Sequence, residues 1–516
     1  MRAVEQALRE FADSDRPLVR VLAASGAGPQ QVHSYREITR AAQALADRLP
    51  RAGAPLRVGV VCANTPEFVV ADLALLAAKA VEIPVPLAFS AEQAAGLLEE
   101  ADLLLVDSAG ERRLAEWGRE RVVPDHVRVL TVELAELSAA GRPYQVPGTT
   151  EDWICKVIHT SGTTSRPKGV QIRAFGIDAL LASLHGEMPE QAFTGYLSTV
   201  PFSLLIEQVT GLYLVLLDGG QVTLLPPEAE LIGTSAEAVR AVLPHLRAAR
   251  PTALVATPAL VAELAHAAKA AVAAGLGVAE ELFGTPAVPV LCCGGAPVHP
   301  DTLRELDELG VPVYEGYGLS ENSSVVAWNT PGNRRIGTVG KPLPHVRVKL
   351  GPDGELLVNS TSLFAGYTRD DPSSCLLEDG WLHTGDLATL EDGFVRITGR
   401  KKNVIITSAG RNIAPEWVEA QYTRLPFVQA AAVVGNQLTE LHGLFVVAPG
   451  TDPAAARAEI ERFGAEHLSE IEQVRAVHLA EAGGPAFRSY FTVTGRPVRA
   501  AIERAIADGT LSLTFS

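Results

Sequence analysis

The sequence predicts an α/β protein with more than one domain, built mainly on parallel sheets. Its 516 residues exceed what a single hydrophobic core usually supports. A strand–helix–strand pattern begins at residues 57–63 and recurs along the chain. Beyond about residue 335 short strands and turns replace this pattern. We therefore expect a large α/β region followed by a smaller β region.

The first strand–helix–strand unit shows the local signals clearly. Residues 57–63 form an apolar run typical of a buried strand, and residues 81–87 form another. Between them, Thr65 and Pro66 supply an N-cap and a first-turn proline for a helix that we expect to reach Ala80. This order predicts parallel strands joined by a right-handed crossover.

Further apolar runs predict strands at residues 157–159, 221–225, 252–256, 289–293 and 311–315. The last two lead directly into residues 294–297 and 317–321, which are rich in glycine and polar side chains. Parallel sheets bind ligands at the carboxyl ends of their strands, so these segments are candidate binding loops.

The chain after about residue 335 predicts two further units. Residues 347–350 and 355–358 flank the turn Gly351-Pro-Asp-Gly354 and predict a hairpin in a small, barrel-like β subdomain. The final 115 or so residues mix helix and strand patterns, as in a small separate α+β domain.

Composition excludes several broad classes of protein. A net charge of −16 argues against a general surface for nucleic acid or anionic membranes, so an anionic nucleotide would need locally placed cations. The most apolar window, residues 71–88, is interrupted by Asp72, Lys79 and Glu82, which argues against a transmembrane segment. The first ten residues resemble a surface helix more than a signal peptide. The five cysteines show no CxxC or metal-ligand spacing, which favours reduced thiols in a cytoplasm.

The most informative segment is His159-Thr-Ser-Gly-Thr-Thr-Ser-Arg-Pro-Lys-Gly-Val170. Its five hydroxyl side chains, two glycines and two cations could wrap a polyphosphate. It is not a Walker A loop, because Pro167 precedes Lys168 and Gly-Val follows it. A polar surface turn is the simpler alternative for the segment taken alone.

Four later motifs follow in a set order: Gly294-Gly-Ala-Pro297, Tyr317-Gly-Leu-Ser-Glu321, Trp381-Leu-His-Thr-Gly-Asp386, and Thr398-Gly-Arg-Lys-Lys-Asn403 running into Ser408-Ala-Gly-Arg-Asn-Ile-Ala-Pro415. Together with the phosphate-loop candidate, they resemble the adenylate-forming superfamily of acyl-CoA synthetases, luciferases and peptide-synthetase adenylation domains. The resemblance is strongest to fatty acyl-CoA ligases. It implies an AMP-forming acid–thiol ligase that uses ATP and Mg²⁺, makes an acyl-adenylate and transfers the acyl group to CoA or phosphopantetheine.

The resemblance also assigns roles to individual residues. Catalytic roles fall to Lys168, Ser320, Glu321 and Arg496, with Glu321 as the Mg²⁺ ligand. Nucleotide or acceptor contacts fall to Thr160, Ser161, Gly162, Thr163, Thr164, Lys168, Gly295, Ala296, Pro297, Tyr317, Gly318, Asp386, Arg400, Lys402 and Gly410. Among these, Tyr317 would pack on adenine and Asp386 would accept from ribose. Two histidines, His159 and His383, are interpreted as structural, and His383 is expected in a turn.

Lys402 matches the position about which relatives swing a mobile C-terminal lid, and Gly410 matches a glycine of the pantetheine tunnel. The predicted organisation is an N-terminal domain at 1–399, a hinge at 400–403 and a lid domain at 404–516. The chain lacks a Gly-x-Asp-Ser attachment motif, so an acyl carrier protein would be a separate partner.

The chain departs from the resemblance near its end. Relatives carry a lysine in Thr-Gly-Lys-x-x-Arg, whereas this chain has Arg496 followed by Pro497. Arginine keeps the charge but has a broad planar head, and the proline restricts the backbone of Arg496. We expect adenylation to survive, slowed or retuned.

The acyl site is predicted less directly. Residues 201–208 are similar to a Pro-Leu-x-His-x-x-Glu segment of fatty acyl-CoA ligases, with Leu204 in place of histidine and Glu207 retained. Ser203 stands where amino-acid-activating relatives have an aspartate, which favours an apolar fatty or aryl acid. A plain core helix is an equal alternative for this segment. For the whole chain, a non-catalytic acyl- or nucleotide-binding homologue and a ligase with a non-thiol acceptor stay open.

Overall fold

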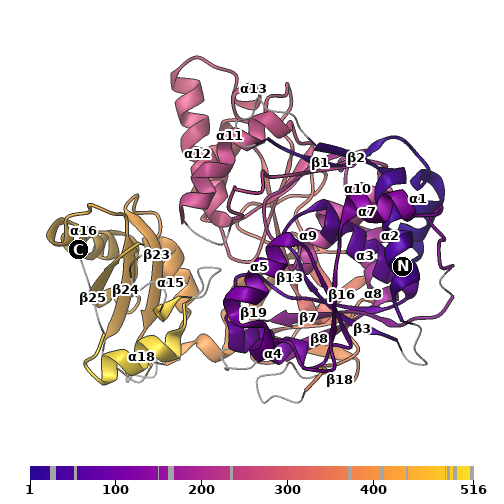
Figure 1. The fold of residues 1–516 in the computed structure, drawn as a ribbon. Coiled ribbons are helices and arrows are strands. Elements are labelled where there is room, and N and C mark those ends of the chain that lie inside the picture. The colour runs from indigo at the N-terminus through magenta and orange to yellow at the C-terminus, as the bar shows by residue number, and fades with distance from the viewer. Residues whose placement is uncertain are drawn as a thin grey trace.

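The computed structural model describes residues 1–516 except for 24–30, 51–54, 149, 161–167, 233–235, 370–374, 376, 407–411, 437, 439, 483, 485–488, 492–496 and 512–516. Two large sheets and a small antiparallel sheet form the body of the molecule, and a C-terminal unit lies at its side (Figure 1).

The six-stranded sheet leads into the phosphate-loop candidate. Its order is β6 (Arg128–Thr131), β5 (Leu103–Val106), β3 (Arg57–Val61), β4 (Val81–Pro84), β7 (Ile154–Thr160) and β8 (Lys168–Arg173). All neighbours are parallel except β7 and β8, which pair antiparallel with Thr160 opposite Lys168. The strand predicted over 81–87 ends at Pro84, since Pro84 and Pro86 have no N–H to continue the ladder.

The nine-stranded sheet carries the second group of candidate loops. Its order is β15 (Lys341–Pro342), β14 (Ser324–Trp328), β13 (Val313–Leu319), β12 (Val290–Cys293), β11 (Ala253–Ala256), β9 (Gly195–Ser198), β10 (Gln221–Leu224), β1 (Pro17–Val21) and β2 (Gln31–Ser34). The six neighbouring strands β13, β12, β11, β9, β10 and β1 run parallel, as the sequence predicts.

Helices cover these sheets and fill the space between them. They are α1 (Arg2–Phe11), α2 (Tyr35–Arg48), α3 (Pro66–Ala78), α4 (Ala91–Leu98), α5 (Ser108–Trp117), α6 (Arg119–Val122), α7 (Leu134–Ala140), α8 (Ala174–Glu187), α9 (Leu205–Gln208), the π-helix η1 (Val209–Tyr213), α10 (Leu214–Leu217), α11 (Ala236–Ala249), α12 (Pro258–Ala273), α13 (Val278–Phe283), α14 (Pro300–Glu308) and the 3₁₀ turn η2 (Ser320–Asn322).

Helix α3 is buried along most of its length, because it packs against β3 and β4 of the six-stranded sheet and against α2. Pro66 occupies its first turn, and Lys79 ends it in the left-handed conformation at φ 51°. Its Phe68 ring stacks on Phe202, which belongs to the segment before α9. The helix thereby joins the six-stranded sheet to the predicted acyl segment.

The small sheet has five antiparallel strands and curls on itself. They are β16 (Val346–Leu350), β17 (Glu355–Ser360), β18 (Leu377–Glu378), β19 (Trp381–Glu391) and β20 (Phe394–Arg400). The predicted hairpin is formed by β16 and β17. His383, expected in a turn, lies within β19 instead, because the Trp381–Asp386 motif is part of one continuous strand of 11 residues.

The C-terminal unit has its own apolar clusters. It contains η3 (Lys401–Asn403), β21 (Ile405–Ile406), β22 (Asn412–Ile413), α15 (Pro415–Tyr422), β23 (Val428–Val434), β24 (Leu441–Val447), α16 (Pro453–His467), β25 (Val474–Glu481) and α18 (Arg499–Ala507). One cluster packs around Tyr422 and Phe445, and another around Tyr490 and Ile502. The domain boundary after residue 399 and the hinge at 400–403 stay predictions.

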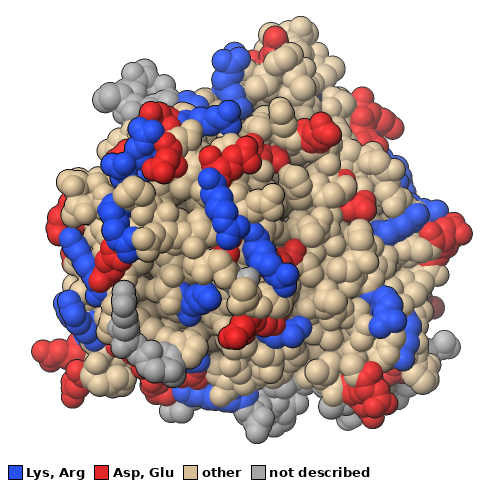
Figure 2. Space-filling view, turned by 90° about the vertical axis from the view of Figure 1, so that its right-hand side faces the viewer, with Lys and Arg blue, Asp and Glu red and all other residues tan. Residues whose placement is uncertain are grey.

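The surface carries both signs of charge. On the face shown in Figure 2, lysine and arginine side chains lie among aspartates and glutamates, without a field of one sign. In the described part of the chain, no helix is long and apolar enough to cross a membrane.

Candidate active site

Three of the predicted nucleotide residues, Tyr317, Asp386 and Arg400, contact one another although they come from two sheets. Tyr317 lies on β13 and Asp386 on β19, and the Tyr317 hydroxyl donates to Asp386 Oδ2 at 2.5 Å. Arg400, opposite Asp386 in the β19–β20 ladder, donates through Nε to Asp386 Oδ1 at 2.7 Å. Burial, reinforced by the Asp386 charge, raises the pKa of Tyr317, so its hydroxyl stays a donor.

A second contact group surrounds the predicted metal ligand. Glu321 lies in η2 with its side chain largely buried, and the Tyr367 hydroxyl donates to Glu321 Oε1 at 2.7 Å. The Nζ atom of Lys168, at the start of β8, lies 4.5 Å from the centre of the Tyr367 ring. Lys168 and Glu321 thus contact opposite parts of one tyrosine.

The two contact groups are connected through Cys375. Its backbone N–H donates to the Tyr367 hydroxyl at 3.0 Å, and its Sγ lies 3.9 Å from the carbonyl oxygen of Thr384. The Thr384 hydroxyl in turn accepts from the backbone N–H of Asp386 at 3.1 Å. The predicted ribose and metal residues therefore belong to one continuous network.

The glycine motifs lie at or near the ends of β12 and β13. Gly295 follows β12 with φ +86°, and Gly295, Ala296 and Pro297 are exposed. Gly318 lies beside β14, where an added Cβ would come within 1.8 Å of the Ser324 carbonyl oxygen. Only glycine fits at 318, since the obstacle is backbone.

The structure describes some of the remaining predicted residues and not others. Ser320 is half-buried beside Glu321, and Lys402 is exposed in η3. Thr160 is the last residue of β7. Ser161, Gly162, Thr163, Thr164, Gly410 and Arg496 lie outside the described residues.

His159, interpreted as structural, is neutral in its surroundings. Burial, with the nearby Arg57 and Arg369 charges, lowers its pKa to about 3. His383 supports the strand carrying Asp386, because its Nδ1 lies 3.3 Å from Glu355 Oε2 and Glu355 also accepts from the Gly385 N–H. The contact between His383 and Glu355 is that of a supporting side chain, and the interpretation of His159 as structural stays a prediction.

The predicted acyl segment contains a buried glutamate. Glu207 in α9 accepts from the Ser198 hydroxyl at 2.6 Å and from the Tyr196 hydroxyl at 2.7 Å. Burial raises the pKa of Glu207 to about 8. The helix continues into the π-helix η1, a distortion that is frequent at functional sites.

Beneath this segment lies a buried cluster that the sequence did not suggest. Lys156 of β7 contacts Glu82 and lies 2.7 Å from Asp72, while Gln208 donates to Glu82 and Tyr213 donates to Asp72. Asp72 and Glu82, the two carboxylates that interrupt the apolar window at 71–88, are therefore buried ion-pair partners of Lys156.

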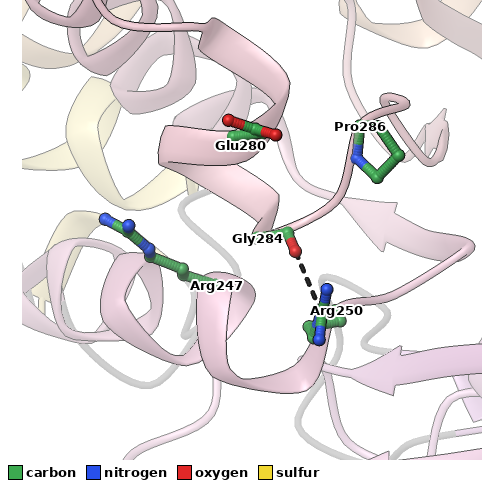
Figure 3. Close-up of a pocket in the computed structure, with 5 residues that line it drawn as sticks. All are labelled: Arg247, Arg250, Glu280, Gly284 and Pro286. Atoms are coloured by element: carbon green, nitrogen blue, oxygen red, sulfur yellow. Dashed lines mark hydrogen bonds between the residues drawn. The ribbon is translucent and has the colours of Figure 1, made fainter.

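Two surface hollows are lined by residues other than those of the contact groups. One, about 390 Å³, lies between α11 and α13, where Arg250 donates to the Gly284 carbonyl oxygen (Figure 3). The other, about 360 Å³, is lined by Arg57, Glu100, Gln171 and Thr368. Neither contains a residue predicted for the site.

Tyr367 and Cys375 were missed by the sequence reasoning. Gly366, the residue before Tyr367, takes φ +128°, but a single glycine does not identify a site in the sequence.

Metal binding fits this arrangement. In the part of the chain that the structure describes, no three His, Cys, Asp or Glu side chains are grouped as a protein-only metal site. Mg²⁺ at nucleotide sites is commonly held by one or two carboxylates together with phosphate oxygens. Glu321 can supply such a carboxylate.

Comparison with known proteins identifies the class. A family model described as "AMP-binding enzyme" matches residues 8–368, and the chain belongs to that family. The family model, together with the relatives and solved structures below, confirms the predicted family, fold class and enzyme class, an AMP-forming acid–thiol ligase. It also confirms ATP-dependent activation of an acid and transfer of the acyl group to CoA.

Two proteins with similar sequences are named as long-chain fatty-acid–CoA ligases or synthetases. The long-chain-fatty-acid–CoA ligase FadD15 of Mycobacterium tuberculosis is 28% identical over 454 residues, covering 76% of this chain and 73% of that protein. The peroxisomal long chain acyl-CoA synthetase 6 of Arabidopsis thaliana is 25% identical over 505 residues, covering 84% of this chain and 70% of that protein.

Solved structures share the fold. The anthranilate CoA ligase AuaEII in complex with anthranoyl-AMP has a TM-score of 0.78 at 17% identity, covering 98% of this chain and 97% of that one. The O-succinylbenzoate CoA synthetase MenE of Bacillus subtilis, with ATP and magnesium, has a TM-score of 0.72 at 21% identity, covering 97% and 99%.

Proposed function

We propose that this protein activates a fatty acid with MgATP and transfers the acyl group to CoA. The observation that carries the proposal is the continuous network joining Lys168, Tyr367 and Glu321 to Asp386, Arg400 and Tyr317. The Lys168 ammonium and the Glu321 carboxylate belong to the same network as Asp386 and Arg400, which supports the roles proposed for them below. ATP, Mg²⁺ and CoA are the substrates and metal of the class to which the chain belongs.

The chemistry has two balanced steps. A carboxylate oxygen attacks the α-phosphorus of ATP, and the bond to the β-phosphate oxygen breaks to release pyrophosphate. The thiolate of CoA then attacks the acyl carbon, and AMP leaves with the bonding electrons. Neither step requires a covalent bond to the protein, so the protein acts by positioning and charge stabilisation.

Residue roles follow from this proposal. Lys168, with residues 160–164, holds the β- and γ-phosphates, and Ser320 donates to the α-phosphate. Glu321 holds Mg²⁺, which would neutralise charge on the phosphates. Asp386 accepts from ribose, while Arg400 keeps Asp386 oriented through its hydrogen bond. Gly295, Ala296, Pro297, Tyr317 and Gly318 form the adenine side.

A fatty acid is favoured over an aryl acid by the two sequence relatives named above. The segment before α9 agrees with an apolar acid, since Phe202 is buried against Phe68 and Leu205 is also buried. Ser203 stands where amino-acid-activating relatives have an aspartate, and its side chain supplies no carboxylate for an α-ammonium group. An aryl preference is the alternative that a substrate panel separates.

Acceptor delivery involves the C-terminal unit. We propose that residues 400–403 act as the hinge, with Lys402 at its centre, and that Gly410 lines the passage for the pantetheine arm. CoA is the proposed acceptor, and a carrier-protein phosphopantetheine is the alternative. The five cysteines are free thiols, which supports a reducing compartment such as the cytoplasm.

Hydroxylamine trapping tests the first step. The protein, MgATP and free acids of increasing chain length, together with benzoate-type acids, are incubated with hydroxylamine, and hydroxamate is measured. Hydroxamate from fatty acids, and acyl-CoA when CoA replaces hydroxylamine, is expected. No hydroxamate from any acid would favour the non-catalytic homologue, whereas hydroxamate without acyl-CoA would favour another acceptor.

Arg496 is tested separately. Wild type is expected to release pyrophosphate in the presence of acid, and Arg496→Gln is expected to lower that rate by about 10²–10³-fold, the effect of losing one aimed donor. Arg496→Lys should retain activity because it keeps the charge. Equal rates for all three would show that Arg496 takes no part in adenylation.

A further inference from the structure

Tyr367 contacts both of the charged groups that the proposed reaction places around the triphosphate. Its hydroxyl donates to Glu321 Oε1 at 2.7 Å, and its ring faces the Lys168 ammonium at 4.5 Å from the ring centre. Lys168 lies on β8 of the six-stranded sheet, whereas Glu321 lies on the turn η2 that joins β13 to β14 of the nine-stranded sheet. Tyr367 follows the small sheet's β17 and therefore links all three parts.

The backbone holds this tyrosine in a fixed place. Tyr367 forms an isolated antiparallel bridge with Val170 of β8, and its carbonyl oxygen accepts from Gln171 Nε2 at 3.1 Å. The ring of Phe364 packs edge-on against the Tyr367 ring, with 4.8 Å between the ring centres. The backbone N–H of Phe364 donates to the Glu321 carbonyl oxygen at 2.9 Å. The tyrosine and the glutamate are thus tied to the same short segment.

The hydrogen bond also selects one carboxylate oxygen. Oε1 of Glu321 is taken by the Tyr367 hydroxyl, and within the described residues Oε2 accepts no hydrogen bond. The hydroxyl itself accepts from the Cys375 N–H, so its proton is directed toward Glu321. The arrangement fixes the plane of the carboxylate and leaves Oε2 as its coordinating atom.

We propose that Tyr367 is a positioning residue that sets the affinity of the site for Mg²⁺ through Glu321 and holds Lys168 against the phosphates through its ring. The inference rests on the proposed nucleotide site but not on the identity of the acid. Groups that hydrogen-bond a metal ligand typically change metal affinity by about 10- to 100-fold when removed. A cation over a tyrosine ring contributes about 0.5–1 kcal/mol at an exposed site, so we assign the ring the smaller effect.

The test separates the hydroxyl from the ring. Tyr367→Phe keeps the ring and loses the hydroxyl, whereas Tyr367→Leu loses both. The control is Tyr144→Phe, which removes a tyrosine hydroxyl that donates to the Leu73 carbonyl oxygen at 2.8 Å, remote from the network. For each protein, binding of a fluorescent ATP analogue is titrated at a series of Mg²⁺ concentrations and again in EDTA.

Tyr367→Phe is expected to raise the Mg²⁺ concentration for half-maximal nucleotide binding by about 10- to 100-fold, with binding in EDTA unchanged. Tyr367→Leu should show the same Mg²⁺ shift and also weaken binding in EDTA, because Lys168 loses its support. Tyr144→Phe should match wild type.

An unchanged Mg²⁺ midpoint in Tyr367→Phe would overturn the proposal. The proposal would also be overturned if Tyr367→Phe lost nucleotide affinity equally in EDTA and in Mg²⁺, because that pattern marks a general loss of structure. The assay measures binding without turnover, so it can succeed even when no acid yields hydroxamate. Failure of the proposed function and failure of the Tyr367 proposal are therefore distinguishable.

Discussion

The two sides of the candidate site are each organised around a buried glutamate, but the two carboxyl groups are used differently. On the nucleotide side, Glu321 accepts one side-chain hydrogen bond among the described residues, from Tyr367, and its second oxygen is the one we propose for Mg²⁺. On the acyl side, both oxygens of Glu207 accept from hydroxyls, and burial raises its pKa to about 8. The first arrangement suits a ligand that carries charge, and the second fixes the protein itself. Burial alone therefore does not identify a functional carboxylate, whereas the number of oxygens left for a ligand does.

The largest expected effect concerns the charge cluster beneath the acyl side. Lys156→Met should destabilise the fold by about 3–5 kcal/mol, because Asp72 and Glu82 lose their buried partner. The matched control is Lys269→Met, which removes an exposed pair with Glu305 and should cost about 0–1 kcal/mol. Urea unfolding followed by tryptophan fluorescence measures both. Similar losses in the two variants would contradict a supporting role for the cluster.

On the nucleotide side, Glu321→Gln should lower acid-dependent pyrophosphate release by about 10²–10³-fold, since the neutral amide cannot replace the metal-binding charge. Thermal unfolding should change little by comparison. Glu308→Gln, at the exposed end of α14, serves as the control and should retain wild-type activity. A large fall in melting temperature with unchanged turnover would give Glu321 the structural part that we assign to Glu207.

The difference between the two sides also explains what could be predicted from the sequence. Most nucleotide-side residues lie in short motifs at strand ends, where the local pattern gives both the strand and the loop that follows it. Asp386 and Arg400 were found instead through the family resemblance, since Asp386 lies in the middle of β19. The structure places Arg400 Nε 2.7 Å from Asp386 Oδ1. Their assigned roles stay predictions.

Contacts between distant segments could not be predicted. Tyr367 is 46 residues from Glu321, and Lys156 is 84 residues from Asp72. An isolated tyrosine or lysine has no local pattern that names its partner, so only the packed structure reveals these pairs. The parallel strands were predicted because strand and helix periods are local, while the length of β19 and the π-helix depend on packing.

A pH series sharpens the contrast for Glu207. A carboxyl group whose folded pKa is about 8 stabilises the fold fully below its unfolded pKa, and that contribution is lost as the pH rises through the folded value. Glu207→Gln cannot titrate. The stability of wild type relative to Glu207→Gln should therefore fall between about pH 5 and pH 8, by at most about 1.4 kcal/mol per pH unit. Melting temperatures of the two proteins across this range provide the measurement. A difference that does not vary with pH would show that Glu207 is ionised in the fold.

The smallest expected effect concerns the contact between the body and the C-terminal unit. Arg424, which follows α15, lies 3.2 Å from Asp301 of α14, and Gln421 lies 3.3 Å from His299. Both partners of the ion pair are partly exposed, so the pair contributes about 0.2–1 kcal/mol and weakens in salt.

If residues 400–403 form the proposed hinge, this pair stabilises one of two lid positions, and Arg424→Gln shifts the balance between them. Adenylation and thioester formation should then change in opposite directions, each by less than about fivefold, because 1 kcal/mol corresponds to roughly that factor. Separate measurement of pyrophosphate exchange and of acyl transfer from preformed acyl-adenylate gives the two rates. Arg462→Gln, which removes exposed pairs within α16, is the control. Rates that fall together in Arg424→Gln would instead indicate that the contact supports the C-terminal unit without selecting between its positions.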